Sequence, residues 1–199
     1  MSELENIALF DLDSTLCDYS KAMKKDYNLL KSPNDPEFQD FIDEENPYLK
    51  NRKRIIVNQP GWWKNLEPLK IGFDILNVAR EIGFSIGILT KAPKHAPNAW
   101  TEKSIWVRKH VSDAQILTIT QDKGLVYGKV LVDDWPAYIK RWIENRPRGL
   151  VIIPAQTWNK EFHHPNAIRY DGTNIEIIKK ALEIAKNRNQ REPLDLSNL

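Results

Sequence analysis

The sequence has a single cysteine, Cys17, and no apolar run that approaches the roughly 18 residues of a membrane-spanning helix. One cysteine cannot form an internal disulfide bond, which favours a reducing compartment. The first five residues, Met-Ser-Glu-Leu-Glu, lack the apolar stretch of a signal peptide. We therefore expect a cytoplasmic protein that does not associate with a membrane.

The sequence also lacks a strong net charge. Its 29 basic and 27 acidic residues give a formal charge of +2, which is too weak to indicate nucleic-acid binding. No internal repeat or low-complexity segment interrupts the chain, and a hydrophobic content of 41% is typical of a globular protein. With 199 residues, we expect one domain carrying a modest insertion.

Apolar patterns divide most of the chain into alternating strands and helices. Short apolar runs predict strands over residues 6–10, 84–89, 115–119, 129–132 and 150–153. Apolar residues at helical spacing predict helices over residues 71–82, 101–111, 136–144 and 174–186. This alternation indicates an α/β fold with a doubly wound, Rossmann-like parallel sheet, whose ligands bind beyond the carboxyl ends of the strands.

Residues 17–66 break the alternation after the first strand. This stretch is rich in charge, and two short amphipathic helices are predicted over residues 21–30 and 36–45. The sequence therefore predicts a small helical cap over residues 17–66, inserted into a core made of residues 1–16 and 67–199.

Residues suited to phosphoryl transfer follow three of the predicted strands. They are Asp11 and Asp13 after the first strand, Thr90 and Lys91 after the second, and Asp133 and Asp134 after a later one, with Lys103 in a helix between them. The carboxyl ends of parallel strands meet at one edge of a sheet, so we expect these groups to meet. Carboxylates at such close range repel unless a hard cation such as Mg²⁺ lies between them. Each feature alone has an ordinary explanation, such as a solvated turn or a helix cap.

The order of these residues resembles the four-motif pattern of the haloacid dehalogenase superfamily. The motifs here are Asp11-Leu12-Asp13-Ser14-Thr15, Thr90, Lys103 and Asp133-Asp134. A closer resemblance is to the 5'(3')-deoxyribonucleotidases, which share three further elements. These read Pro60-Gly61-Trp62-Trp63, Lys103-Ser104-Ile105-Trp106-Val107 and Leu117-Thr118-Ile119-Thr120-Gln121-Asp122-Lys123 in this chain. The resemblance extends from residue 6 to residue 140.

The resemblance implies a phosphatase that uses Mg²⁺. Asp11 would attack phosphorus as a nucleophile, and Asp13 would act first as general acid and then as general base. Mg²⁺ would be held by Asp11, by the backbone carbonyl of Asp13 and by Asp134, with Asp133 orienting a bound water.

The remaining expected site residues contact the substrate. Thr90, Lys91 and Lys103 are expected at the phosphate, and Tyr19, Trp62 and Trp63 are expected to wall a base-binding pocket, because a planar base stacks well on aromatic rings. Any one of these tryptophans considered alone is more often a core residue. The turn-forming pair Pro60-Gly61 can aim the two rings at different surroundings, so only one of them need face the site.

Three positions depart from the family pattern. Ser14 stands where the family usually has Gly, Lys91 stands where it typically has Ser, and Gln121 stands where it typically has Arg. These departures bear on nucleotide preference and leave the phosphatase chemistry intact.

We expect a 5'(3')-deoxyribonucleotidase that acts on small-molecule nucleoside monophosphates. Two alternatives stay open: a phosphatase for another small phosphomonoester or for a nucleic-acid end, and a metal- and nucleotide-binding module without turnover. The basic run at residues 50–54 could gather an anionic substrate, although such a run is more often a solvated helix face. The sequence leaves the oligomeric state open, with a homodimer as one option.

Overall fold

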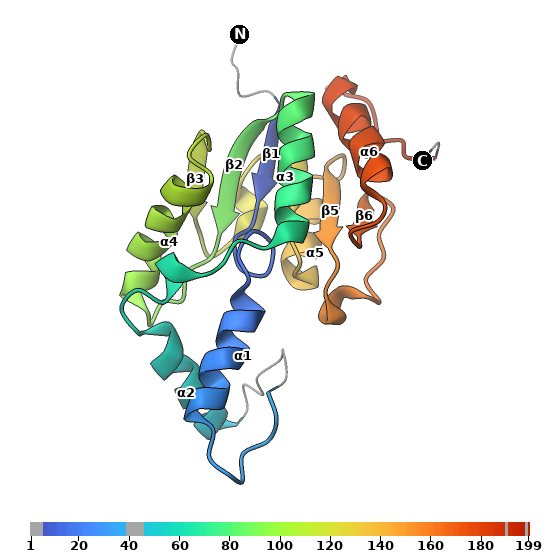
Figure 1. Cartoon of the computed structure of the whole chain (residues 1–199). Helices are drawn as coiled ribbons and strands as arrows, with labels where there is room; N and C mark the ends of the chain where they lie inside the picture. Colours follow the sequence, from blue (N-terminus) through green and yellow to red (C-terminus); the bar gives the residue numbers. More distant parts are fainter. Residues whose placement is uncertain (1–5, 39–45, 190, 198) are drawn as a thin grey trace.

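The computed structural model describes residues 6–38, 46–189, 191–197 and 199. Within this part of the chain, six parallel strands form one sheet in the order β3-β2-β1-β4-β5-β6 (Figure 1). The strands are β1 (Ile7–Phe10), β2 (Ser85–Thr90), β3 (Ile116–Ile119), β4 (Val130–Val132), β5 (Leu150–Pro154) and β6 (Ala167–Tyr170). The order runs outward from β1 in both directions, which confirms the predicted doubly wound α/β fold.

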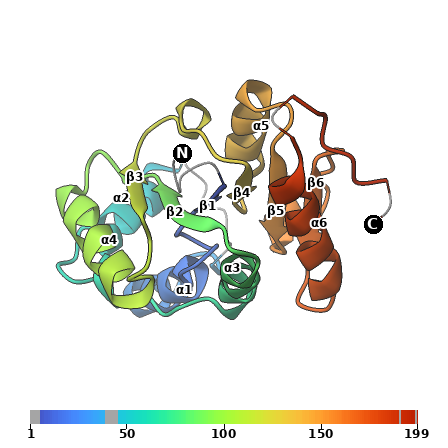
Figure 2. The same cartoon turned by 90° about the horizontal axis from the view of Figure 1, so that it is seen from above.

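Helices cover both faces of the sheet. They are α1 (Tyr19–Leu30), α2 (Pro47–Val57), α3 (Lys70–Ile82), α4 (Pro97–His110), α5 (Pro136–Asn145) and α6 (Ile175–Asn187). Because side chains alternate along a strand, Ala8 and Phe10 of β1 join a core cluster with residues of α3, α4 and α6, whereas Ile7 and Leu9 pack with α5. Seen from above, α5 lies on the opposite side of the sheet from α3 and α6 (Figure 2).

Most predicted elements match the structure, with three differences. The helix predicted over residues 101–111 begins earlier, at Pro97, which is favourable at a first helical turn. Strand β6 was not predicted, because its four residues lie at the edge of the sheet and include Arg169. The helix predicted over residues 36–45 is not supported, since residues 36–38 are not helical and residues 39–45 lie outside the described part.

Helices α1 and α2 lie together beyond the carboxyl ends of the strands (Figure 1). Asn46 caps α2 by accepting hydrogen bonds from the backbone N–H groups of Tyr48 and Leu49. The basic run at residues 50–54 belongs to α2, but it is not a uniformly solvated face. Arg52 is buried, forms an ion pair with Asp35 and lies over the Tyr48 ring at 4.7 Å.

A tight turn after β1 sets up the site. Ser14 has a left-handed backbone with φ of 56°, and its N–H donates to the carbonyl of Cys17 at 2.9 Å. Helix α3 packs directly on this turn, because a side chain at Gly72 would meet the carbonyl oxygen of Thr15 at 1.8 Å. The conformation explains why a residue without a side chain suits position 14, and the structure accommodates Ser14 there nonetheless.

Candidate active site

The predicted strand ends meet at one edge of the sheet, as expected from their order. Strand β1 pairs with β2 on one side and with β4 on the other, so the turn after β1 lies between the ends of both neighbours. Asp11 and Asp13 follow β1, Thr90 ends β2, and Asp133 and Asp134 follow β4. This edge is the position at which doubly wound sheets bind their ligands.

Three carboxylates form a buried cluster at this edge. Asp11, Asp133 and Asp134 each offer an oxygen, and these oxygens lie within 4.8 Å of one another. Asp134 is held from two sides, because its Oδ1 accepts a hydrogen bond from Thr15 Oγ1 and its Oδ2 accepts one from Trp158 Nε1, each at 3.0 Å. These two hydrogen bonds hold the Asp134 carboxylate in place, and the three carboxyl groups lie close enough together to concentrate negative charge when ionised.

The pKa values of these carboxyl groups reflect that density. Burial raises the pKa of Asp133 to about 6, although the cation of Lys123 opposes the rise. Burial raises the pKa of Asp134 well above its ordinary value, and the nearby carboxylates of Asp133 and Asp11 raise it further. A cation bound among these three groups would remove the cause of both shifts.

Lys123 is the basic residue in contact with the cluster. Its Nζ lies 2.6 Å from Asp133 Oδ2 and 2.9 Å from Asp11 Oδ1, and its side chain is buried. Burial alone would lower the pKa of Lys123, but Asp11 and Asp133 raise it above its ordinary value. Lys123 was not among the predicted site residues, although it ends the Leu-Thr-x-x-Asp-Lys motif that carried part of the family resemblance.

Asp13 belongs to a second, separate ion pair. Its Oδ2 lies 2.6 Å from Lys103 Nζ, which also donates to Thr90 Oγ1 at 3.0 Å and to the carbonyl of Lys91 at 2.6 Å. Burial raises the pKa of the Asp13 carboxyl, with Lys103 opposing the rise and Asp11 adding to it. Lys103 and Asp11 thus act on the pKa of Asp13 in opposite directions.

A cavity of about 580 Å³ opens in front of both ion pairs. Of the expected site residues, Asp11, Asp13, Tyr19, Trp63, Lys91 and Asp134 line it. Helix α2 contributes Lys53 to the lining, and Tyr138 and Trp158 complete an aromatic wall that sequence reasoning missed. Thr90, Lys103 and Asp133 lie behind the surface, where their contacts hold the lining residues in place.

The two adjacent tryptophans face different surroundings. Trp63 is buried beside the cavity, and Lys103 Nζ lies 4.7 Å from the centre of its ring. Trp62 does not line this cavity; its Nε1 donates to Asp26 Oδ2 at 2.8 Å on the other side of α1. The expectation that Trp62 touches a ligand beside Asp11 is therefore not supported by its position.

A buried glutamate, Glu102, fixes the segment that carries these rings. Its carboxylate accepts hydrogen bonds from the N–H groups of Gly61 at 2.7 Å, Trp63 at 3.0 Å and Lys64 at 3.4 Å. Since Lys103 is the next residue of α4, the same helix turn holds both Trp63 and Asp13. No sequence signal marked Glu102, because an isolated Glu in a helix is expected to be solvated.

The acidic cluster fits a divalent cation with oxygen ligands. Its three buried carboxylates are in contact with one ammonium group, so negative charge exceeds positive charge at the cluster. Asp11 Oδ1 is buried and, although close to Lys123, accepts no hydrogen bond within the described residues. Hard oxygen donors without thiol or imidazole ligands suit Mg²⁺ better than a softer metal.

Known proteins match most of the chain in sequence. Residues 5–183 match the family model described as 5' nucleotidase, deoxy (pyrimidine), cytosolic type C protein (NT5C). A candidate 5'(3')-deoxyribonucleotidase of Bordetella pertussis is 28% identical over 163 residues, which cover 78% of this chain and 86% of that protein. A candidate of the same description from Vibrio phage KVP40 is 29% identical over 104 residues, covering 49% of this chain and 59% of that protein.

Two solved structures also match the chain. A candidate haloacid dehalogenase-like hydrolase of Burkholderia xenovorans LB400 matches with a TM-score of 0.49 and 15% identity, covering 88% of this chain and 98% of that chain. A HAD-superfamily hydrolase of Ehrlichia chaffeensis matches with a TM-score of 0.47 and 11% identity, covering 92% of this chain and 97% of that chain. In the described part of the molecule, no helix is long and apolar enough to span a membrane.

Proposed function

The chain belongs to the 5' nucleotidase, deoxy (pyrimidine), cytosolic type C family, and from this premise we propose that it is an Mg²⁺-dependent 5'(3')-deoxyribonucleotidase. Family membership makes it a phosphatase of the 5'-nucleotidase type. The observation that supports the finer assignment is the cavity itself: Asp11 and Asp13 line the same cavity as the aromatic rings of Tyr19 and Trp63. Phosphate chemistry thus lies beside the half-buried ring of Tyr19, which is available to a planar base, with the buried Trp63 ring packed against it at 5.8 Å between ring centres.

The reaction would proceed through a phosphorylated aspartate. The carboxylate of Asp11 forms a bond to phosphorus while the bond from phosphorus to the leaving oxygen breaks, and Asp13 gives its proton to that oxygen. Asp13 then takes a proton from water, whose oxygen attacks phosphorus and releases Asp11 together with inorganic phosphate. The raised pKa of Asp13 suits a group that must carry a proton in the first step.

Asp11, Asp134 and the backbone carbonyl of Asp13 would hold Mg²⁺, with Asp133 orienting a bound water. When bound, the cation supplies positive charge for the oxygens around phosphorus, which phosphoryl transfer requires. Lys123 supplies further charge beside Asp11, and Lys103 keeps Asp13 oriented while remaining close to Thr90.

Residues outside the core would close the site over a small substrate. We propose that residues 17–66 act as a cap on a core of residues 1–16 and 67–199. Helices α1 and α2 support this division, since they lie beyond the strand ends and contribute Tyr19 and Lys53 to the cavity. The buried free thiol of Cys17 is consistent with the cytoplasmic location that we propose.

Release of inorganic phosphate from a substrate panel tests the proposal. The panel contains 5'- and 3'-deoxyribonucleoside monophosphates, ribonucleoside monophosphates, glycerol phosphate, nitrophenyl phosphate and a 5'-phosphorylated oligonucleotide. We expect Mg²⁺-dependent turnover with the deoxyribonucleotides preferred, and loss of that turnover in Asp11→Asn. Preference for glycerol phosphate or the oligonucleotide would replace the substrate assignment, and nucleotide binding without phosphate release from any substrate would replace the enzyme assignment.

A further inference from the structure

A short segment after β5 contacts both of the loops that carry the acidic cluster. This 155–159 segment follows directly on Pro154, the last residue of β5, and ends in a 3-10 helix at Thr157–Asn159. One of its side chains reaches the loop after β4, and another reaches the turn after β1. The segment is thus placed to hold the two loops relative to each other, although the proposed reaction assigns it no role.

The indole of Trp158 fixes the carboxylate of Asp134. Its Nε1 donates to Asp134 Oδ2 at 3.0 Å, while Thr15 Oγ1 donates to Asp134 Oδ1, also at 3.0 Å. A carboxylate turns easily about its last side-chain bond, because that torsion has only broad minima. Donors on both oxygens remove this freedom, and each oxygen keeps a lone pair for a cation. Loss of the indole N–H would therefore release one side of a proposed Mg²⁺ ligand.

Gln156 fixes the turn that carries the backbone carbonyl of Asp13. Its Nε2 donates to the carbonyl of Ser14 at 2.8 Å, and the N–H of Ser14 donates to the carbonyl of Cys17 at 2.9 Å. The Asp13 carbonyl belongs to the same planar peptide unit as the Ser14 N–H and points the opposite way. The peptide units on both sides of Ser14 are thus held, and they set the direction of the Asp13 carbonyl.

Buried Asn159 joins the segment to the backbone of β5 and of Asp134. Its Nδ2 donates to the carbonyls of Asp134 at 3.0 Å and Pro154 at 2.9 Å, and its Oδ1 accepts from the Gln156 N–H at 3.0 Å. Arg169 of β6 donates to the same Oδ1 at 3.3 Å and to the Gln156 carbonyl at 3.1 Å. Both polar atoms of the Asn159 side chain therefore have partners, as a fully buried amide requires. These contacts anchor the segment to the sheet.

We propose that Trp158 and Gln156 are positioning residues for the metal site, each acting through a ligand of the cation. Mg²⁺ demands a near-ideal octahedral arrangement of oxygens, so its affinity depends on how its ligands are oriented before it binds. Hydrogen-bonding partners of metal ligands typically contribute about 10- to 100-fold to metal affinity or activity. The inference rests on the proposed function, since that function makes Asp134 and the Asp13 carbonyl ligands of Mg²⁺.

Binding of Mn²⁺ to the full chain tests this role without any need for turnover. Free Mn²⁺ gives a sharp electron paramagnetic resonance signal that is lost on binding, so a titration yields the dissociation constant. Trp158→Phe keeps an aromatic ring but removes the donor to Asp134, and we expect the dissociation constant to rise by about tenfold. Gln156→Met keeps the length of the side chain but removes the donor to Ser14, and it should also raise the constant.

An unchanged dissociation constant in one variant would remove that residue from the proposal, and an unchanged constant in both would overturn it. Absence of Mn²⁺ binding in the wild type would overturn the proposed metal site and the positioning role together. If the wild type binds Mn²⁺ but hydrolyses no nucleotide, the proposed function fails, and the titration still decides the role of the 155–159 segment.

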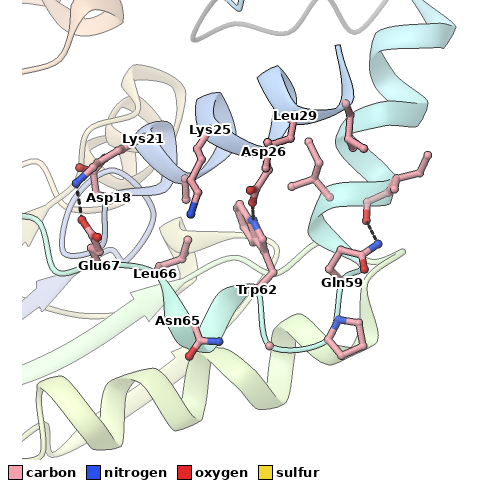
Figure 3. Close-up of a pocket in the computed structure, with 16 residues that line it drawn as sticks. Asp18, Lys21, Lys25, Asp26, Leu29, Gln59, Trp62, Asn65, Leu66 and Glu67 are labelled. Carbon is pink, nitrogen blue, oxygen red and sulfur yellow. Dashed lines mark hydrogen bonds and ion pairs between the residues drawn. The ribbon is translucent and has the colours of Figure 1, made fainter. Parts of the chain in front are cut away.

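Trp62 offers a matched control, because it makes the same kind of hydrogen bond away from the acidic cluster. Its Nε1 donates to Asp26 Oδ2 at 2.8 Å in a second cavity, of about 600 Å³, which α1 and residues 59–67 help to line (Figure 3). Trp62→Phe should lower the stability measured by urea unfolding but leave the affinity for Mn²⁺ at the wild-type value. If it weakens Mn²⁺ binding as much as Trp158→Phe does, the loss reflects a general loosening of the fold and the positioning role is wrong.

Kinetics separate positioning of the metal from contact with the substrate, because Trp158 also lines the cavity in front of Asp11. A positioning role predicts that Trp158→Phe needs more Mg²⁺ for half-maximal turnover of deoxyribonucleotides, by the same factor as the loss of Mn²⁺ affinity. KM for the nucleotide at saturating Mg²⁺ should stay at the wild-type value. A raised KM with an unchanged requirement for Mg²⁺ would mean that Trp158 contacts the substrate, which contradicts the positioning role.

Discussion

Lys123 Nζ lies 2.9 Å from Asp11 Oδ1, and the same ammonium group reaches Asp133 at 2.6 Å. One buried cation thereby partners the proposed nucleophile and a carboxylate of the acidic cluster at once. The arrangement leaves Asp134 with neutral donors, from Thr15 and Trp158. Loss of Lys123 would therefore affect both stability and metal binding.

We predict that Lys123→Gln destabilises the metal-free protein by about 3–5 kcal/mol, because removal of one partner leaves buried carboxylates uncompensated. Excess Mg²⁺ should recover much of this loss. Urea unfolding with EDTA and with Mg²⁺ measures both effects, and Lys179→Gln on the exposed side of α6 serves as the control. A loss of the same size with and without Mg²⁺ would show that Lys123 stabilises the fold independently of the metal site.

The contribution of Asp133 to metal-free stability should fall as pH rises from about 4 to about 6. The Asp133 carboxyl has a folded-state pKa of about 6, against about 3.9 in an unfolded chain, so the folded state holds the proton in this window while the unfolded state has released it. Burial also raises the pKa of Asp134, so the contribution of Asp134 to metal-free stability likewise falls as pH rises. Mg²⁺ competes with these protons, so its stabilising effect should grow as pH increases through 6.

Thermal unfolding at pH 5, 6, 7 and 8, each with EDTA and with excess Mg²⁺, checks this linkage. The difference in Tm between the two conditions isolates the metal site, since groups elsewhere contribute equally to both. We expect a small difference at pH 5 and a larger one at pH 7 and 8. A difference that does not change with pH would show that the cluster binds Mg²⁺ without releasing protons.

Asp13→Asn should lower turnover of nucleotides by about 10²–10⁴-fold, the usual contribution of a general acid or base. The loss should be smaller for the first step with nitrophenyl phosphate, because its leaving oxygen needs no proton. Rapid-mixing measurements of nitrophenol release separate that step from hydrolysis of the phosphorylated enzyme. Equal losses with good and poor leaving groups would rule out Asp13 as the acid.

The sequence was sufficient to predict five of the six strands and the residues that follow them, because both depend on local patterns. Three apolar runs end at or just before Asp11, Thr90 and Asp133, which places polar side chains at the end of each strand. Because these strands are parallel and adjacent, their ends meet at one edge of the sheet. What the sequence could not supply was long-range pairing. Nothing near Glu102 indicates that it accepts hydrogen bonds from residues 61–64, and nothing near Trp158 indicates its contact with Asp134.

The two tryptophans show the same limit. Their adjacency indicated that one ring could face the site, but which one depends on how the Pro60-Gly61 turn packs against α4. Gly61 has φ of 87°, and its N–H donates to Glu102, so the turn is fixed by a residue distant in sequence. The structure accordingly places Trp63 beside Lys103 and Trp62 beside Asp26.

Ser14→Gly should stabilise the protein by about 1 kcal/mol. A non-glycine residue in the left-handed region costs about 1–3 kcal/mol, and the extra freedom that glycine gives the unfolded chain offsets part of the gain. Urea unfolding measures the difference, and Ser14→Ala is the matched control because it removes the hydroxyl but keeps the strain. A stability of Ser14→Gly equal to that of Ser14→Ala would indicate that the backbone at position 14 is not strained.

Glu102→Gln should selectively impair nucleotide use. The amide keeps one acceptor oxygen but replaces the other with a donor, so at least one of the hydrogen bonds from Gly61, Trp63 and Lys64 is lost. The Trp63 ring would then be held less firmly against Tyr19, and a substrate that stacks a base on Tyr19 should bind more weakly. We expect KM for deoxyribonucleotides to rise by about 5- to 30-fold, which corresponds to about 1–2 kcal/mol.

Nitrophenyl phosphate distinguishes this effect from general damage, because it requires Asp11, Asp13 and Lys103 but has no base. Its KM and kcat should stay within about twofold of wild type if Glu102 acts on the ring alone, a change below about 0.4 kcal/mol. Glu81→Gln, an exposed glutamate on α3, controls for the loss of one negative charge. If Glu102→Gln instead lowers kcat for both substrates by the same factor, the glutamate acts through Lys103 and the geometry of Asp13, since Glu102 and Lys103 are neighbours in α4.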